Sequence, residues 1–178
     1  MIKITRYLLV ALVAMAFCTV VSQGQTKKPR KTTTPMKTSA TLPPLDVRAA
    51  RVKVSNQLTN INLFVERLGP IAQAIEAVDA ESKTKTLSKE SLDKNVTDKQ
   101  KVVTAIRNLR EGMVKLESEF RVKPALKKYL VTIQGISELA GQSEASALAG
   151  RMVAANAPLR SIQQKLNDTL TAMPNADL

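Results

Sequence analysis

Lysine and arginine are the residues of this sequence whose number and spacing could support a function. The chain has 178 residues, with 27 Lys and Arg against 15 Asp and Glu, and its formal net charge is +12. Side chains of one sign gathered in one segment attract partners of the opposite sign, such as acidic lipid headgroups or polymers. The basic residues of this chain concentrate in a segment before residue 45 and in a second cluster beyond residue 120.

The first concentration lies in residues 23–44, which read QGQTKKPRKTTTPMKTSATLPP and contain no acid. So polar a composition cannot bury enough apolar surface to offset chain entropy, and we expect a disordered linker. Its five basic residues suit weak, salt-sensitive attachment to an anionic surface, and the alternative is a solvated spacer. Nucleic acid would attract the same charges, but no aromatic residues are interleaved for base stacking, so we do not expect that partner. The basic residues are Lys27, Lys28, Arg30, Lys31 and Lys37.

The second concentration surrounds Pro124, where we expect a helix to begin. No acid lies between Glu119 and Glu138. A helix N-terminus is an unfavourable place for cations, which favours a role in contacting anions. The alternative is a positive, solvated helix end. The cluster consists of Arg121, Lys123, Lys127 and Lys128, and Arg107 and Arg110 would widen it.

The sequence lacks the residue types on which several classes of site depend. It has no His, which excludes His-ligated metals, haem held by His, and Ser-His-Asp or Cys-His dyads. A single Cys excludes an internal disulfide and an iron–sulfur cluster. No Gly-rich phosphate loop or serine nucleophile motif is present, so we expect a protein that is not an enzyme and holds no cofactor or metal. We expect Met113, Met152 and Met173, on or near apolar stripes, to fill the core.

Residues 1–22 have the parts of a secretory signal peptide. Two basic residues precede an apolar run from Tyr7 to Val21, and the small residue Ser22 follows it. The run has 15 residues, whereas a membrane-spanning helix needs about 20. We therefore expect cleavage after Ser22, or two residues later after Gly24, and export to the periplasm or the extracellular space. The alternative is an uncleaved membrane anchor, and Cys18 is interpreted as a small apolar residue within the run.

Residues 45–174 show the apolar periodicity of α-helices. Two stripes alternate spacings of four and three residues, and Thr97 and Gln100 resemble a capping box before the second. Leu92 and Val96 would extend that helix backwards, after a polar connection at residues 80–92. Pro70 interrupts the first stripe without shifting its phase, so it should kink one long helix or restart it. The first stripe is Val54, Leu58, Ile61, Val65, Leu68, Ala72 and Ile75, and the second is Val102, Ile106, Leu109, Met113, Leu116 and Phe120.

Two further helices are expected after Pro124. The third should end near Gly141, and the fourth should begin at Ser143 and end before Pro174. Pro158 should kink or break the fourth helix. The third helix should bury Leu126, Tyr129, Leu130, Ile133, Ile136, Leu139 and Ala140, and the fourth Leu148, Met152, Ala155, Leu159, Ile162, Leu166, Leu170 and Met173.

Four such helices joined by short loops predict an all-α, up-down four-helix bundle over residues 45–174, followed by a short tail at 175–178. No stretch alternates with the period of a strand. The spacing also permits a coiled-coil homodimer, which is the alternative. The acids of the second helix are expected on a solvated face, with Glu117 pairing with Arg121 and Glu111 with Lys115. Glu117 and Glu119 point to different sides of a helix, so we expect no cation site between them.

These features together favour a binding protein over an enzyme. We expect an exported helical bundle that its basic tail attracts to an anionic surface of the cell envelope, where its partner is a protein, an acidic polymer or lipid. The alternative is a structural protein of the envelope that associates with itself through its apolar stripes.

Overall fold

Residues 43–175 are described by a computed structural model, and within this range all regular structure is helical. The all-α class is therefore confirmed for the described residues. The predicted signal peptide, the basic linker as far as residue 42, and residues 176–178 of the predicted tail lie outside the described residues. Over the range that is described, no helix has both the length and the apolar character needed to cross a membrane. The helices are α1 (Leu45–Ser82), α2 (Lys89–Val122), the 3₁₀ helix η1 (Pro124–Tyr129), α3 (Leu130–Ile133), α4 (Ile136–Leu148) and α5 (Asn156–Ala172).

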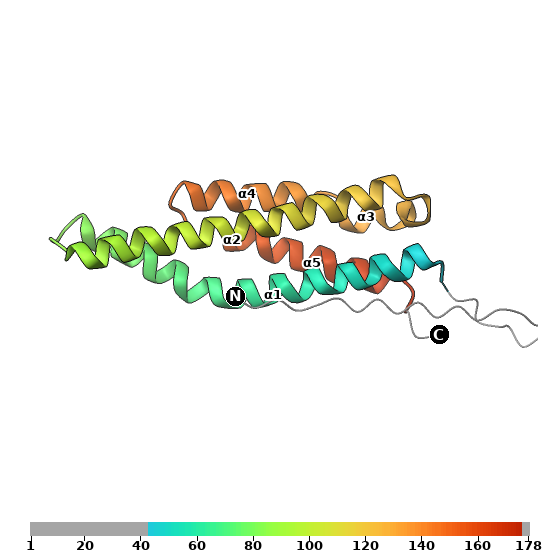
Figure 1. Cartoon of the computed structure of the whole chain (residues 1–178), viewed down its shortest axis with the longest axis horizontal. Coiled ribbons are helices and arrows are strands. Elements are labelled where there is room, and N and C mark those ends of the chain that lie inside the picture. Colours follow the sequence, from blue (N-terminus) through green and yellow to red (C-terminus); the bar gives the residue numbers. More distant parts are fainter. Residues whose placement is uncertain (1–42, 176–178) are drawn as a thin grey trace, which may run out of the picture. The chain divides into compact units, whose positions relative to one another are not determined.

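The first predicted stripe lies on one continuous helix. Pro70 is inside α1, so the helix does not restart there. Figure 1 shows the axis of α1 bending on its way to the turn that joins it to α2, and a proline inside a helix is the usual cause of such a bend. All members of the stripe are buried except Leu58, which is partly buried against the core.

The start of α2 differs from the predicted capping box. The N-cap is Ser88, whose hydroxyl oxygen accepts a hydrogen bond from the backbone N–H of Ser91 at 3.2 Å. Thr97 lies inside the helix and donates to the backbone carbonyl of Asp93. The prediction that the helix extends backwards through Leu92 is correct, and a serine at the start of that extension supplies a better-placed cap than Thr97.

The third predicted helix begins at Pro124 as expected, but it is not continuous. Gly135 has a φ of 87°, a left-handed conformation that interrupts the helix between α3 and α4. Gly141 does not end a helix, because it lies inside α4 with the side chain of Arg110 packed nearby. Gly150, with a φ of 75°, takes that role after α4. The predicted boundary at Gly141–Ser143 is therefore wrong.

The displaced boundary also changes the fourth predicted helix. Ser143 lies inside α4, buried, and donates to the carbonyl of Ala155 at 2.8 Å. Leu148, which the stripe placed in the core, is exposed at the end of α4. Pro158 neither kinks nor breaks a helix, because it lies in the first turn of α5, where its missing N–H would have no partner within the helix.

The core lies between four of the helices. In this unit α2 packs against α1 and α4, and α5 packs against α1 and α4 (Figure 1). The shared interior contains the expected methionines Met113, Met152 and Met173, all buried. Burial of the two stripes by other helices of the same chain removes their apolar side chains from water, which is the main driving force for folding.

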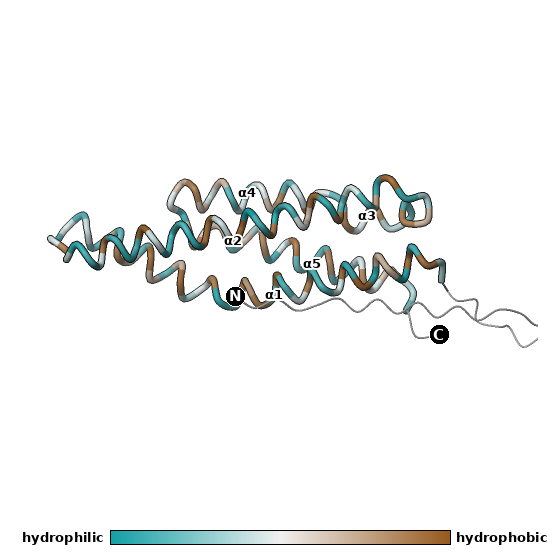
Figure 2. The backbone as a smooth tube through the Cα atoms, viewed as in Figure 1, coloured by the Kyte–Doolittle hydropathy of each residue, from teal (hydrophilic) through white to brown (hydrophobic). Residues whose placement is uncertain are grey.

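The α1–α2 turn extends beyond the ends of α4 and α5. Figure 1 shows α1 and α2 continuing as a two-helix hairpin past the other helices. Asp79 on α1 makes polar contacts with α2 in this hairpin: its Oδ1 accepts a hydrogen bond from Asn95 Nδ2 at 2.7 Å and pairs with Lys99 Nζ at 2.5 Å. Hydrophilic and hydrophobic residues alternate along this hairpin (Figure 2), and Leu92 and Val96 on it are exposed.

Candidate functional site

Two of the four predicted basic residues around Pro124 are engaged in ion pairs. Arg121 Nη2 donates to Glu117 Oε1 at 2.5 Å, as its i, i+4 spacing predicts. Lys123 Nζ lies 2.8 Å from Asp46 Oδ1 and 2.8 Å from Glu119 Oε1. Their charges are balanced by carboxylates of the same chain, so these two residues offer less to an outside anion than expected. Lys27, Lys28, Arg30, Lys31 and Lys37 lie outside the described residues.

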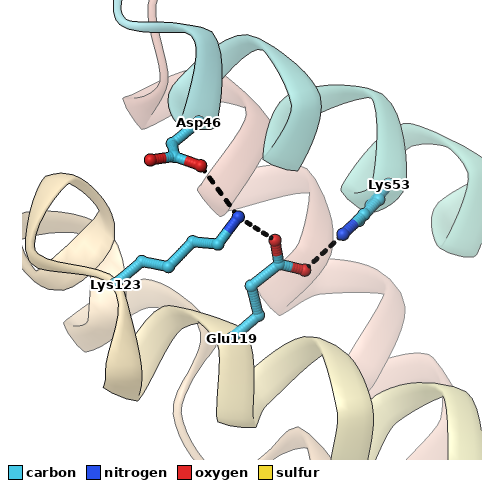
Figure 3. Close-up of polar contacts among 4 residues, drawn as sticks. All are labelled: Asp46, Lys53, Glu119 and Lys123. Atoms are coloured by element: carbon cyan, nitrogen blue, oxygen red, sulfur yellow. Dashed lines mark hydrogen bonds and ion pairs between the residues drawn. The ribbon is translucent and has the colours of Figure 1, made fainter.

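Lys123 belongs to an alternating chain of charges that joins the start of α1 to the end of α2. Figure 3 shows Asp46, Lys123, Glu119 and Lys53 in that order, with Lys53 Nζ 2.6 Å from Glu119 Oε2. The carboxylates of Asp46 and then of Glu119 raise the pKa of Lys123 to about 12. Burial alone would raise the pKa of Glu119, but Lys123 and Lys53 outweigh it and lower that pKa. The network spans the start of α1 and the end of α2.

The other two predicted residues, Lys127 and Lys128, are exposed on η1. Neither lies within ion-pair distance of a carboxylate among the described residues. Lys128 Nζ is 4.8 Å from the ring centroid of Tyr129, a cation–π contact that leaves the ammonium group accessible. Tyr129 itself is buried, which fixes η1 on the helices beneath it.

A cleft of about 430 Å³ lies beside these lysines. Pro43 and Pro44, where the described residues begin, form part of its wall together with Lys128 and Tyr129. The chain from the basic linker thus enters the helical unit next to η1. The remaining lining residues are Val47, Pro124, Ala125 and Pro174.

Arg107 and Arg110 do not widen this cluster. Arg107 Nε and Arg110 Nη1 bind the two oxygens of Glu144 on α4, at 2.9 and 2.8 Å. The side chain of Glu144 is buried, and Arg110 and then Arg107 lower its pKa against the opposing effect of burial. The three residues join α2 to α4, so the expectation that these arginines contact an outside anion is replaced by a structural role.

Glu117 is a structural carboxylate that does not lie where the sequence predicts it. It was expected on a solvated face, but its side chain is buried against the start of α4. Its Oε1 accepts from the backbone N–H of Gly135 at 3.0 Å, and its Oε2 accepts from the N–H and the hydroxyl of Ser137 at 3.0 and 2.7 Å. Gly135 is the N-cap of α4 and has no side chain to accept these bonds, so Glu117 supplies the cap from another helix.

These hydrogen bonds determine the charge state of Glu117. Burial alone would raise its pKa, but the Gly135 N–H, the Arg121 guanidinium and both donors of Ser137 stabilise the carboxylate and lower the pKa from 4.5 to about 2. The positive end of the α4 helix dipole acts in the same direction. The carboxylate is therefore ionised at neutral pH and serves as a fixed structural anion.

One signal in the sequence could have revealed Glu117. It follows Met113 by four residues and precedes Phe120 by three, and both of these are buried. An acid at such a position lies on the apolar face of its own helix, where a partner must satisfy it. Nothing in the sequence identifies Gly135 and Ser137 as that partner, because they lie on a different helix.

A second capping contact fixes the end of α5. Arg51 on α1 donates from Nη1 to the carbonyls of Leu170 and Met173, at 2.5 and 2.8 Å, and from Nη2 to Asn175 Oδ1 at 2.8 Å. A guanidinium group is well suited to the free carbonyls of a helix C-terminus. The guanidinium group of Arg51 thus binds groups of the same chain at the end of α5.

Between residues 43 and 175, no group of three or more His, Cys, Asp or Glu side chains is arranged to hold a metal ion. Comparison of the chain with protein-family models, with curated proteins and with solved structures finds no match. The candidate site is therefore defined by its own geometry: Lys127, Lys128 and the cleft where the basic linker joins the helices.

Proposed function

We propose that this protein is an exported, non-enzymatic up-down four-helix bundle that attaches to an anionic surface of the cell envelope. Attachment uses the basic linker and the exposed lysines of η1 together. The attachment holds the bundle at this surface. The buried charged residues of the bundle stabilise its own fold.

The observation that carries this proposal is that Pro43 and Pro44 line the same cleft as Lys128. Lys37, the last basic residue of the linker, is six residues before Pro43. Six residues of chain reach at most about 20 Å, so this lysine must act on the same end of the bundle as Lys127 and Lys128. The two basic groups, which are far apart in the sequence, can therefore meet one surface together.

The strength expected from this arrangement is modest. A basic residue near an anionic membrane surface contributes about 1 kcal/mol, and the contribution falls within a Debye length of about 8 Å at physiological ionic strength. Lys127 and Lys128 add their positive charge to that of the linker, because no carboxylate of the described residues pairs with them. The attachment should be reversible and sensitive to salt.

Binding to vesicles and polyanions tests this proposal. The protein would be purified in the form that cells contain, with its N-terminus identified by mass spectrometry, and mixed with phosphatidylglycerol vesicles and with immobilised polyphosphate at increasing salt. We expect binding to at least one of them at low salt, and weaker binding of Lys127→Gln/Lys128→Gln. The control is Lys83→Gln/Lys89→Gln, which neutralises two exposed lysines at the α1–α2 turn. Absence of binding to both at low salt would contradict the proposal.

Self-association is a second candidate function, and the exposed apolar residues of the α1–α2 hairpin favour it. The stripes expected in a coiled-coil dimer are buried within one chain, so a dimer would need another surface. Ile71 on α1 and Val96 on α2 are exposed near this hairpin. Sedimentation equilibrium separates this candidate from the first: a dimer that Ile71→Ser/Val96→Ser converts to a monomer would support it, and a wild-type monomer would exclude it.

A further inference from the structure

The three most exposed large apolar side chains of the described residues all lie at the end that carries the basic residues. Leu45, Val122 and Val131 are 74%, 73% and 69% exposed. Leu45 is the first residue of α1 and Val122 is the last of α2. Val131 is on α3, which contacts η1 and α2. Large apolar groups left in water at one end of a protein commonly mark an interaction surface.

Two of these residues are sequence neighbours of the two partners of one ion pair between helices. Leu45 precedes Asp46, and Val122 precedes Lys123, and the Asp46–Lys123 pair spans 2.8 Å between α1 and α2. Figure 3 shows this junction of the two helices, and Figure 1 shows α3 near the same end of the helical unit. Leu45, Val122 and Val131 are called the apolar rim below.

We propose that the apolar rim inserts into the interfacial region of an anionic lipid bilayer, with Lys127 and Lys128 contacting lipid phosphates. This inference rests on the proposed function and narrows its anionic surface to lipid. An acidic polymer supplies negative charge but no apolar phase, so it gives no reason for three large apolar side chains to face water. A bilayer interface offers both, because apolar side chains enter the acyl boundary while lysines reach the headgroups.

The charges at this end fit a negatively charged membrane. Three of its acids pair with basic residues of the fold: Asp46 with Lys123, Glu119 with Lys53 and Lys123, and Glu117 with Arg121. Glu138, in the first turn of α4, is exposed and has no ion-pair partner among the described residues. Lys127 and Lys128 remain without carboxylate partners among the described residues. The end that carries the apolar rim is therefore positive as well as apolar, and these two properties together favour peripheral binding to anionic lipids.

The opposite end of the helical unit has exposed apolar residues too, but acids and lysines are nearly balanced there. Val96 and Leu148 are exposed there, but the lysines of the α1–α2 hairpin include three that pair with acids. Exposed apolar residues at that end thus have a mixed-charge surrounding. They provide controls, because they are similar side chains at the end that contains residues 79–101, where six lysines are nearly balanced by five acids. The paired lysines are Lys85, Lys99 and Lys101.

A fluorescent reporter tests insertion directly. The chain contains no tryptophan, so Val122→Trp introduces a single indole at the apolar rim, and Val96→Trp introduces one at the opposite end as a control. On mixing with vesicles of equal parts phosphatidylglycerol and phosphatidylcholine, we expect the emission of Val122→Trp to shift to shorter wavelength. Brominated acyl chains should quench it, and Val96→Trp should change in neither respect. Unchanged emission of Val122→Trp on vesicles that bind the protein would overturn the inference.

A second measurement separates the inference from the proposed function. Leu45→Ser/Val122→Ser/Val131→Ser should bind the same vesicles about tenfold more weakly, because apolar area no longer leaves water. Its binding to polyphosphate should be unchanged. The control Val96→Ser/Leu148→Ser/Val153→Ser, at exposed positions away from the rim, should bind vesicles as the wild type does.

The outcomes of that measurement are distinct. Equal vesicle binding by the rim variant and the wild type overturns lipid insertion but leaves attachment to anionic surfaces standing. Failure of the wild type to bind either vesicles or polyphosphate overturns both proposals. Circular dichroism of each variant establishes that it is folded, which we expect because all the substituted side chains are exposed.

Discussion

Glu117 and Glu119 are two residues apart near the end of α2, yet they belong to two different regions of the molecule. The side chain of Glu117 is 4% exposed and meets the start of α4, whereas that of Glu119 is 15% exposed and meets surface lysines. The partners of Glu117 include the backbone N–H groups of Gly135 and Ser137, whose positions are fixed. The partners of Glu119 are ammonium groups on long side chains, and that of Lys53 is 54% exposed.

This difference shows why a short ion-pair distance is a poor guide to stability. Ordering two exposed, flexible side chains costs entropy, and water and salt screen their attraction. The buried carboxylate satisfies backbone donors that would otherwise be left without partners, and leaving such donors unsatisfied is costly. We therefore expect the Glu117 region to determine how the chain folds at α4, and the Glu119 region to contribute little.

The largest effect should come from Glu117→Ala. The substitution leaves the part-buried N–H groups of Gly135 and Ser137 without their acceptor, and removes the partner of Arg121. We expect the free energy of unfolding to fall by about 3 kcal/mol. Urea unfolding followed by circular dichroism at neutral pH measures this change.

The control for that substitution is Glu111→Ala, on an exposed face of the same helix. A surface acid of this kind should change the free energy of unfolding by less than about 0.5 kcal/mol. If Glu117→Ala and Glu111→Ala gave equal losses, the buried carboxylate would not be the cap that fixes α4.

The next effect is a loss of stability in acid. The pKa of Glu117 is lowered from 4.5 to about 2, so its contribution is complete above pH 4.5 and is lost as the pH falls from about 4.5 to 2. We expect about 2 kcal/mol of the free energy of unfolding to be lost in this window. Urea unfolding at a series of pH values measures it.

The variant Glu117→Gln tests the assignment of that pH dependence. It cannot titrate at this position, so its stability should vary less between pH 4.5 and 2. Part of the dependence should remain, because the pKa values of Glu119 and Glu144 are also lowered. If the stability of the variant depended on pH as strongly as that of the wild type, the loss of stability in acid would come from other groups.

A smaller effect is expected from a substitution of Gly135, the N-cap of α4 whose N–H binds Glu117. Gly135 has a φ of 87°, so Gly135→Ala should cost about 1 kcal/mol of stability through backbone strain, since no atom lies within 4 Å of the added methyl group. Gly141→Ala is the matched control, because this residue is inside α4 and its methyl group would make only an ordinary contact with the Arg110 side chain, 3.7 Å away. It should raise stability by about 0.5–1 kcal/mol. Thermal unfolding distinguishes the two signs.

The positions of the core residues could be predicted from the sequence because each stripe is a property of one helix. The spacing from Val54 to Ile75 and from Val102 to Phe120 identifies the buried faces of α1 and α2. It fails at Leu148, because the phase of a stripe does not show where a helix ends. The end of a helix depends here on the backbone conformation of a glycine. Gly135 and Gly150 have positive φ and interrupt helices, whereas Gly141 lies inside α4.

The candidate site was predictable only in part, since its charges pair across helices. The sequence identifies the basic cluster and the pair between Arg121 and Glu117, which are four residues apart. It cannot show that Lys123 meets Asp46, which is 77 residues away, or that Arg107 meets Glu144. Such pairs are set by the packing of helices, and they determine which cations remain free for an outside partner.

The smallest effect should come from the surface network. Lys53→Gln removes one ammonium group from Glu119 but leaves Lys123 in place, so the free energy of unfolding should fall by less than about 0.5 kcal/mol. Raising the salt concentration should remove even this difference, because salt screens exposed charges. The loss caused by Glu117→Ala should persist at high salt, since most of it comes from unsatisfied backbone donors. A salt-independent loss of several kcal/mol from Lys53→Gln would place Glu119 in the same category as Glu117. In that case burial, and not the fixed position of the donors, would be the property that the two regions share.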